Sequence, residues 1–157
     1  MLGLCHIVHR DGLLDRAFID ARTEGYDALE QLLEAYAPDA VEEITGVPAA
    51  DLEAAAHIYG EAENASILWG LGVTEHLYGS EVVQLICNLA MLTGKVGRRG
   101  SALLPLRGQN NVQGSSDMGA LPDTYTAYRS VCATSSPKIH IAFRRPSTAA
   151  SSICGTV

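Results

Sequence analysis

The sequence predicts an α/β fold in which several helices precede a strand, glycine loop and helix unit, and in which an irregular loop follows that unit. Three patterns support this prediction. Apolar residues recur at helical spacing through the first 64 residues, and a short apolar run bounded by glycines follows at residues 66–69. A second helical pattern, more apolar than the first, spans residues 80–92.

The composition is that of a globular protein. The chain has 157 residues, of which 47% are hydrophobic and 18% charged, so wholesale disorder is excluded. A net charge of -7 argues against binding to nucleic acid or to an anionic membrane face. The apolar runs are too short to insert into a membrane. Four widely spaced cysteines without a C-x-x-C pattern indicate neither a disulfide framework nor a metal site, which favours a reduced, cytoplasmic chain.

The predicted helix boundaries rest on capping residues. A first helix begins near Leu2 and is closed by Gly12, and Asp15 can cap the next segment. Pro38 suits the first turn of another helix, which Gly46 ends. The remaining early helices are the segment with Tyr26, Leu29, Leu32, Leu33 and Tyr36 at helical spacing and a helix that Pro48 opens and that runs to about Glu63.

In the middle of the chain, the sequence predicts a strand, a glycine loop and a helix, and a functional site commonly lies after such a strand. Residues 66–69 form a short apolar run that ends at Gly70, which is typical of a buried strand followed by a glycine loop. Ser80 can cap the following helix, and Gly94 stops it. Polar residues and glycines dominate residues 95–123, so we expect an irregular loop there, and loops of that length are commonly functional.

The composition changes near residue 124. The segment 124–157 contains eleven serines and threonines and no acidic residue, whereas residues 1–64 contain fourteen acids. We interpret residues 1–125 as one domain and residues 126–157 as a separate tail, either disordered or produced by truncation or a reading-frame change.

Residues 70–76 are the first candidate binding segment. Glycines directly after a strand allow backbone N–H groups to approach an anionic or heteroaromatic ligand, because no Cβ intervenes. The pattern is half of a dinucleotide fingerprint, since Glu75 stands where the third glycine belongs. The alternative is an ordinary turn, and His76 is then simply a solvated or packed histidine.

Residues 105–119 are the second candidate. Four side-chain amides lie within five residues, and each offers donors and acceptors suited to the edge of a pterin or purine. Arg107 adds a guanidinium that can bind a carboxylate through two hydrogen bonds. The alternative is a polar surface loop.

Five segments in succession resemble the catalytic subunits of molybdenum- or tungsten-dependent formate dehydrogenases. These subunits belong to the large molybdopterin oxidoreductase, or dimethyl sulfoxide reductase-like, family that binds two molybdopterin guanine dinucleotides. The resemblance covers residues 2 to about 125 and implies the fold of the central domains of that family, with 1–125 as a partial molybdopterin oxidoreductase domain. The matching segments are residues 22–25 (RTEG), 43–48 (EITGVP), 69–76 (WGLGVTEH), 88–94 (NLAMLTG) and 106–114 (LRGQNNVQG).

The resemblance also implies roles for individual residues. Arg107 would orient formate and stabilise negative charge during its oxidation to carbon dioxide, making it the catalytic residue. No residue of this chain is assigned to the metal. The residues expected to contact the cofactor are Gly70, Leu71, Gly72, Val73, Thr74, Glu75, Gly108, Gln109 and Asn110.

For the parent enzyme, the resemblance implies bis-molybdopterin guanine dinucleotide with molybdenum or tungsten. It also implies a 4Fe-4S cluster that this chain does not bind. The expected partners are formate, the remaining domains of the subunit and electron-transfer subunits. The family's four-cysteine segment and its metal-ligating cysteine or selenocysteine have no counterpart here, so we expect an interior fragment that is inactive alone. The sequence departs from the family at Glu75, commonly Gln, and at Arg99, commonly Pro.

Two alternatives remain at this point. One is a different reaction in the same superfamily, such as that of a nitrate reductase or a quinone-reductase subunit. The other is a stand-alone, non-catalytic binding domain made from the same segment.

Overall fold

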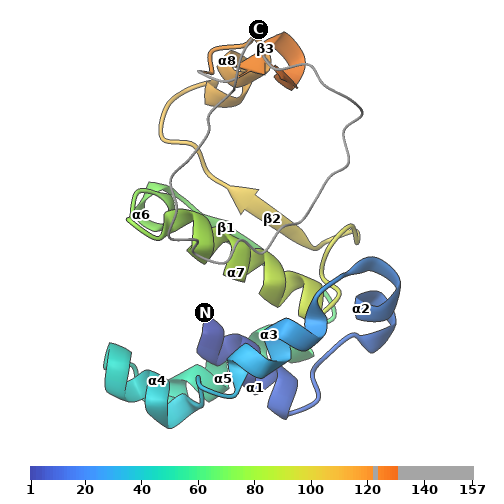
Figure 1. Cartoon of the computed structure of the whole chain (residues 1–157), viewed down its shortest axis with the longest axis vertical. Helices are drawn as coiled ribbons and strands as arrows, with labels where there is room; N and C mark the ends of the chain where they lie inside the picture. The colour runs from blue at the N-terminus through green and yellow to red at the C-terminus, as the bar shows by residue number, and fades with distance from the viewer. Residues whose placement is uncertain (122–123, 131–157) are drawn as a thin grey trace, which may run out of the picture. The chain divides into compact units, whose positions relative to one another are not determined.

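The structure is a computed structural model that describes residues 1–121 and 124–130. The chain divides into two compact units, Met1–Val112 and Gln113–Val157. The first unit is helix-rich with a small parallel sheet (Figure 1), in agreement with the predicted α/β class. Its elements are α1 (Leu2–Arg10), α2 (Arg16–Arg22), α3 (Tyr26–Leu33), α4 (Pro38–Thr45), α5 (Ala49–Glu61), β1 (Ser66–Trp69), α6 (Leu71–Thr74), α7 (Gly79–Leu92) and β2 (Ala102–Pro105).

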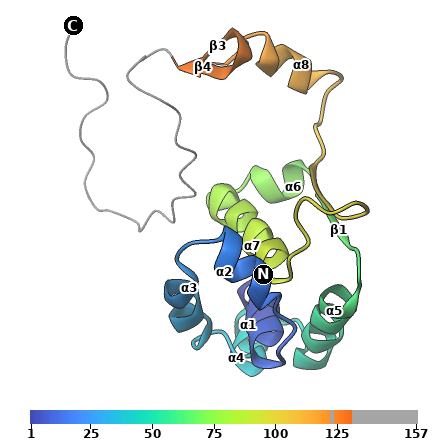
Figure 2. The same ribbon diagram turned by 90° about the vertical axis from the view of Figure 1, so that its right-hand side faces the viewer.

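Helix α1 lies at the centre of the first unit. It contacts α3, α4, α5 and α7, and Figure 2 shows it among the other N-terminal helices below α7. The side chains of Cys5, Ile7 and Val8 are 0% exposed. Burying an Ile or Val side chain contributes about 1.5–3 kcal/mol each, so the buried face of α1 stabilises the core substantially. The core around it consists of Ile19, Leu33, Ala56, Leu89 and Leu92.

The terminal residues predicted for α2 and α4 are confirmed. The Asp15 carboxylate accepts a hydrogen bond from the Phe18 backbone N–H at 2.9 Å, which caps α2. Pro38 occupies the first turn of α4, and Gly46 ends that helix in the left-handed conformation at φ 73°. Helix α5 follows Pro48 and ends at Glu61, two residues before the expected end.

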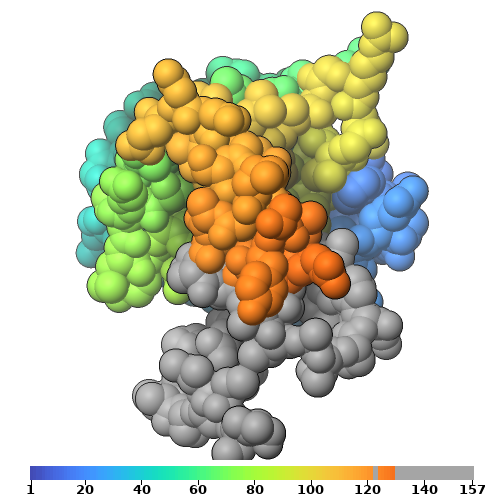
Figure 3. Space-filling model, turned by 90° about the horizontal axis from the view of Figure 1, so that it is seen from above, coloured from blue at the N-terminus to red at the C-terminus, as the bar shows by residue number. Residues whose placement is uncertain are grey.

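The end of α7 is tied to the start of α2. The Leu92 carbonyl accepts a hydrogen bond from the Asp15 backbone N–H at 2.8 Å, and Arg98 forms an ion pair with the Asp15 carboxylate. Gly94 ends α7 as predicted, at φ +62°, and a Cβ there would overlap the Asp15 carboxylate. The exposed segment 96–100, which includes Arg98, projects from the surface in yellow in Figure 3.

Lys95 ties the same region to α5. Its ammonium donates to the Gly60 carbonyl at 3.0 Å and lies 5.1 Å from the centre of the Tyr59 ring. The residue is only 3% exposed, and burial lowers the pKa of the ammonium. The carbonyl end of α5 carries partial negative charge, so a cation there stabilises the helix.

Strands β1 and β2 pair in parallel, from Ser66 opposite Ala102 to Trp69 opposite Pro105. The expectation of a wholly irregular loop at residues 95–123 was therefore wrong, because Ala102–Pro105 is a strand and Val112–Asp117 is a helix, α8. Local sequence did not reveal β2, because its partner lies 36 residues earlier and its last residue is a proline. Its apolar run is only four residues long.

Helix α7 begins at Gly79, two residues earlier than a cap at Ser80 implies. The expected cap, Ser80, lies within the helix, and Tyr78 is the cap residue but makes no side-chain capping bond. Gly79 packs directly against the backbone of Thr74 at the end of α6. The start of α7 is therefore fixed by this close backbone contact and not by a capping side chain.

The described part of the second unit contains a small hairpin. Strand β3 (Thr124–Tyr125) pairs antiparallel with β4 (Arg129–Ser130), and the 3-10 turn η1 (Thr126–Tyr128) joins them. The amide of Gln113 donates to Asp117 at 2.9 Å and to the Tyr128 hydroxyl at 2.7 Å. Residues 131–157 of the predicted tail lie outside the described residues, so the boundary at residue 125 stays a prediction. Within residues 1–121 and 124–130, no helix has the length and apolar character needed to cross a membrane.

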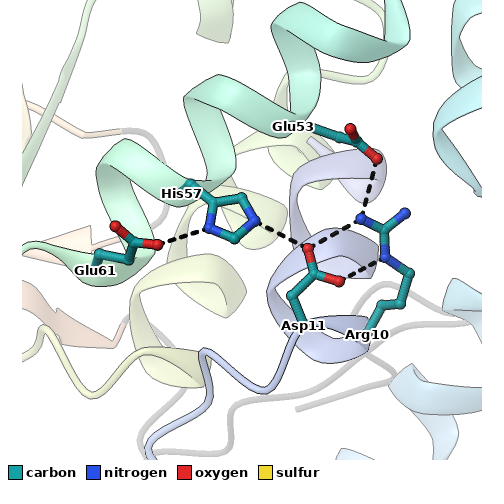
Figure 4. Close-up of polar contacts among 5 residues, drawn as sticks. All are labelled: Arg10, Asp11, Glu53, His57 and Glu61. Carbon is teal, nitrogen blue, oxygen red and sulfur yellow. Dashed lines mark hydrogen bonds and ion pairs between the residues drawn. The ribbon is translucent and has the colours of Figure 1, made fainter.

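A charged network joins the end of α1 to α5 (Figure 4). The Arg10 guanidinium donates to Asp11 at 2.6 and 2.9 Å and to Glu53 at 3.0 Å. The His57 ring lies between Asp11, at 3.0 Å, and Glu61, at 2.8 Å. Hydrogen bonds from Arg10 and then His57 lower the pKa of Asp11 to about 2, and those to Glu61 and then Asp11 raise the pKa of His57. The strength of this polar contact between α1 and α5 therefore depends on pH.

The close approach of Gly79 to Thr74 predicts that any side chain at position 79 lowers the stability of the fold. A Cβ at Gly79 would overlap the Thr74 carbonyl oxygen and lie 2.8 Å from its carbonyl carbon, and backbone cannot rotate aside as a side chain can. We expect Gly79→Ala to lower the free energy of unfolding by about 1–3 kcal/mol, measured by urea denaturation. Gly72→Ala is the matched control, because nothing lies within 4 Å of a Cβ there. Equal midpoints for the two variants would contradict the packing argument.

The network at the α1–α5 seam predicts a bell-shaped dependence of stability on pH. The raised pKa of His57 stabilises the fold fully below the ordinary value of 6.5, and this contribution is lost as pH rises through the folded value. The lowered pKa of Asp11 contributes above the ordinary value of 3.8 and is lost as pH falls toward about 2. Urea midpoints measured from pH 3 to 9 test both limbs.

In that pH series, we expect His57→Gln to flatten the decline above pH 6.5 and to keep the acid limb. His76→Gln is the control, because the exposed His76 lies outside the network. An unchanged alkaline limb in His57→Gln would show that another group causes it.

Candidate site at the carboxyl ends of the strands

The parallel pairing brings the two predicted binding segments to one edge of the sheet. Residues 70–75 follow β1 and residues 106–110 follow β2, and the two strands end opposite each other at Trp69 and Pro105. One further hydrogen bond, from the Leu106 N–H to the Trp69 carbonyl at 2.7 Å, holds the segments together as they leave the sheet. Ligands of open α/β sheets bind outside the carboxyl ends of parallel strands, so this edge is the expected place for a site.

The first segment is a short helix and not the expected glycine loop. Gly70 is extended, at φ -131° and ψ -157°, and α6 begins at Leu71. The Val73 N–H donates to the Gly70 carbonyl at 3.1 Å, and the Glu75 N–H donates to the Leu71 carbonyl at 2.8 Å. Neither glycine of this segment has a positive φ, so the pattern that suggests a loop is compatible with a single helical turn.

The cofactor contacts predicted in this first segment divide by exposure. Leu71, Gly72, Thr74 and Glu75 are exposed, whereas Gly70 and Val73 are partly buried. Leu71 is 41% exposed even though it begins the helical turn. The exposed backbone and side chains of α6 therefore face outward beside the end of β1.

The second segment is exposed throughout residues 104–111. It carries Arg107, Gly108, Gln109 and Asn110, all predicted from the sequence. Asn111 has a positive φ of 57°, which asparagine tolerates better than most residues, and it turns the chain into α8. A guanidinium and two amides thus project together from one short stretch just beyond β2.

The two segments contact each other through Leu71 and Gly108. A Cβ on Gly108 would lie 2.7 Å from the Leu71 Cδ1 atom, so the backbone of the second segment lies directly against this leucine. At Gly70 a Cβ would meet only the Leu106 carbonyl, at an ordinary 3.9 Å. The family resemblance implies that Leu71 and Gly108 both contact the cofactor, but it does not indicate that they contact each other.

Apolar side chains are exposed near the same edge. Leu68 and Leu104 are register partners on the two strands and are 56% and 42% exposed. Between α6 and α7, Leu77 and Tyr78 are 86% and 65% exposed. Their exposure was not predicted, because apolar side chains within an apolar pattern are expected in a core.

The cysteines of the described residues are not placed for metal binding or nucleophilic chemistry. Cys5 is fully buried in α1, and burial raises the pKa of its thiol to about 12, so it is protonated at neutral pH. Cys87 is partly buried in α7, and burial raises the pKa of its thiol as well. Within the part of the chain that the structure describes, no three His, Cys, Asp or Glu side chains converge on one point.

The chemistry of the site follows from its donor set. Amide side chains and exposed backbone can hydrogen-bond to both donors and acceptors at the edge of a heteroaromatic ring. A guanidinium binds a carboxylate through two parallel hydrogen bonds and keeps its charge near neutral pH. The site therefore suits a polar heterocyclic cofactor beside a small carboxylate.

Comparison with known proteins agrees with a cofactor-binding α/β protein. A family model described as molybdopterin oxidoreductase matches residues 1–149. The chain belongs to this family.

The relatives with high similarity carry related names. The chain is 48% identical over 126 residues to formate dehydrogenase H of Escherichia coli (strain K12), a match that covers 80% of this chain and 18% of the relative. It is 48% identical over 128 residues to the F420-dependent formate dehydrogenase 2 subunit alpha of Methanococcus maripaludis, covering 82% and 19%. It is 43% identical over 129 residues to the corresponding subunit alpha of Methanocaldococcus jannaschii, covering 82% and 19%. The chain thus spans about a fifth of the length of these relatives.

Proposed function

We propose that this chain forms part of a formate dehydrogenase that oxidises formate to carbon dioxide. The observation that carries the proposal is the juxtaposition of residues 70–75 and 106–110 at the carboxyl ends of β1 and β2. This edge displays one guanidinium beside amides and exposed backbone, which is the donor set that a carboxylate substrate and a pterin cofactor require. The names of the relatives support the choice of formate.

In this proposal, Arg107 is the catalytic residue. Formate is a small carboxylate, and its two oxygens match the two parallel N–H groups of a guanidinium. Binding both oxygens orients the C–H bond in one direction and offsets the negative charge of the substrate. The oxidation removes two electrons and a proton, and the fixed positive charge of Arg107 stabilises negative charge as the reaction proceeds.

The cofactor contacts fall to the two segments around Arg107. Gln109 and Asn110 would hydrogen-bond to the pterin, and the exposed turn 71–75 would lie beside it. The cofactor, bis-molybdopterin guanine dinucleotide with molybdenum or tungsten, supplies the redox chemistry when it is bound. Glu75, commonly Gln in the family, remains among the proposed cofactor contacts, although its carboxylate adds an acidic group next to an anionic cofactor.

Other parts of the enzyme complete the site in this proposal. The 4Fe-4S cluster and the metal-ligating residue belong to the rest of the subunit, and electron-transfer subunits accept the electrons. This chain then corresponds to a central portion of the molybdopterin oxidoreductase fold and supplies the substrate arginine and part of the cofactor wall. The chain alone is expected to lack activity, because positioning residues without a metal centre have nothing to act on.

The role of Arg107 predicts a large loss of activity in Arg107→Lys. A lysine ammonium keeps the charge but cannot form two parallel hydrogen bonds to formate. We expect kcat/KM for formate to fall by roughly 10²-fold in the cofactor-loaded enzyme, measured by steady-state kinetics. Arg99→Lys is the matched control, because Arg99 is exposed in the projecting segment 96–100. Turnover within twofold of wild type in Arg107→Lys would remove Arg107 from the reaction.

The role of Gln109 predicts a loss of cofactor and not of folding. Leucine has a similar size but no hydrogen-bonding groups, so Gln109→Leu removes the proposed pterin contacts. We expect purified Gln109→Leu enzyme to contain less metal and pterin per subunit, measured by elemental analysis and by the fluorescence of the oxidised pterin. Gln31→Leu on the exposed face of α3 is the control. Full cofactor content in Gln109→Leu would show that this amide does not bind the cofactor.

A further inference from the structure

Gly108 is a glycine for reasons of space and not of backbone conformation. Its φ lies outside the left-handed region, so its backbone conformation does not itself require glycine. A Cβ there would lie 2.7 Å from Leu71 Cδ1 and 3.6 Å from Leu71 Cγ. Real Cβ atoms do not approach a carbon so closely, so the exposed Leu71 side chain must turn away from the Gly108 backbone when residue 108 gains a side chain.

Leu71 belongs to the short helix α6, which is closed by its own hydrogen bond and packs against α7. Its carbonyl accepts a hydrogen bond from the Glu75 N–H at 2.8 Å, which closes α6. Helix α6 contacts α7, and the backbone of Thr74 packs directly against Gly79 at the start of α7. The backbone of α6, which includes Leu71, is therefore held by its packing against the first turn of the longer helix α7.

The segment that carries Arg107 has less backbone support. The pairing of β2 with β1 ends at Pro105, and the hydrogen bond from Leu106 to Trp69 is the last link between the two strands. Arg107 follows that bond directly, and Gly108 is the next residue. Beyond the sheet, the Leu71–Gly108 contact links the arginine segment to α6.

We propose that Leu71 is a positioning residue for Arg107 and acts through Gly108. The δ-methyl group of Leu71 fills the space above the Gly108 backbone and so fixes where the arginine segment leaves the sheet. This inference rests on the proposed function, because it assigns Leu71 to the placement of the formate-binding guanidinium. Displacement of a substrate-orienting group by about 1 Å can cost up to roughly 10²-fold in rate, so a single methyl contact is enough to matter.

The contact is tested by a double-mutant cycle with Leu71→Ala, Gly108→Ala and the two substitutions together. Leu71→Ala removes the methyl groups that hold the segment, and Gly108→Ala inserts a methyl group into the space they occupy. In the double variant, the new Cβ takes up space that the leucine vacates. We therefore expect each single variant to lower kcat/KM for formate by about tenfold, mainly through KM, and the double variant to return to within about threefold of wild type.

A second readout does not depend on formate or cofactor. Hydrogen exchange of the Leu106 backbone amide, which donates to the Trp69 carbonyl, is measured in the chain of residues 1–157 for the same variants. We expect faster exchange in Leu71→Ala and in Gly108→Ala, and slower exchange in the double variant than in either of them. Leu77→Ala is the control, because Leu77 is a leucine of the same region that is 86% exposed.

The outcomes separate the two proposals. Additive effects of the two substitutions on exchange and on KM overturn the positioning role of Leu71. If the wild-type enzyme does not turn over formate, the proposed function fails, and coupled exchange at the Leu106 amide still supports the contact. If Gly108→Ala does not fold, Leu71→Ala decides, since wild-type exchange and KM in that variant overturn the inference.

Discussion

The parallel pairing of β1 with β2 is the constraint on which the candidate site depends. Only four residue pairs form the ladder, from Ser66 opposite Ala102 to Trp69 opposite Pro105. Because both strands run the same way, both following segments leave at one edge, although 36 residues separate them in the chain. An antiparallel pair of the same strands would send residues 70–75 and 106–110 to opposite ends of the sheet.

Such a short sheet depends on the helices that support it. A two-stranded sheet is at best marginally stable in water without packing partners, and Ile67 of β1 packs against the core formed by α1, α2, α3, α5 and α7. The polar ties at Asp15 and Lys95 hold the end of α7 and the following turn against α2 and α5. These ties lie just before β2 and so fix where the second strand begins. The N-terminal helices therefore act on the site indirectly, by holding the connection that returns the chain to the sheet.

Local chemistry made part of this fold predictable. Asp15, Pro38 and Gly46 marked helix ends because capping and left-handed termini depend on residues close in sequence. Strand β2 was missed because parallel pairing is a long-range property, and four residues ending in proline carry little signal. The turn α6 was read as a loop because glycine permits both conformations. The residues of the candidate site could be predicted from their side-chain chemistry and from the family resemblance. The contact between Leu71 and Gly108 could not, because it depends on packing between segments that are distant in the chain.

The central place of α1 also determines the order in which the chain can fold. Helix α1 contacts α7, and the ion pair between Asp15 and Arg98 joins residues 83 positions apart. A ribosome adds roughly 5–20 residues per second, so several seconds pass between the synthesis of α1 and that of its last helical neighbour. During that time the apolar face with Cys5, Ile7 and Val8 lacks the α7 side of its core. Newly made α1 therefore keeps an apolar face uncovered until α7 has been synthesised and packs against it.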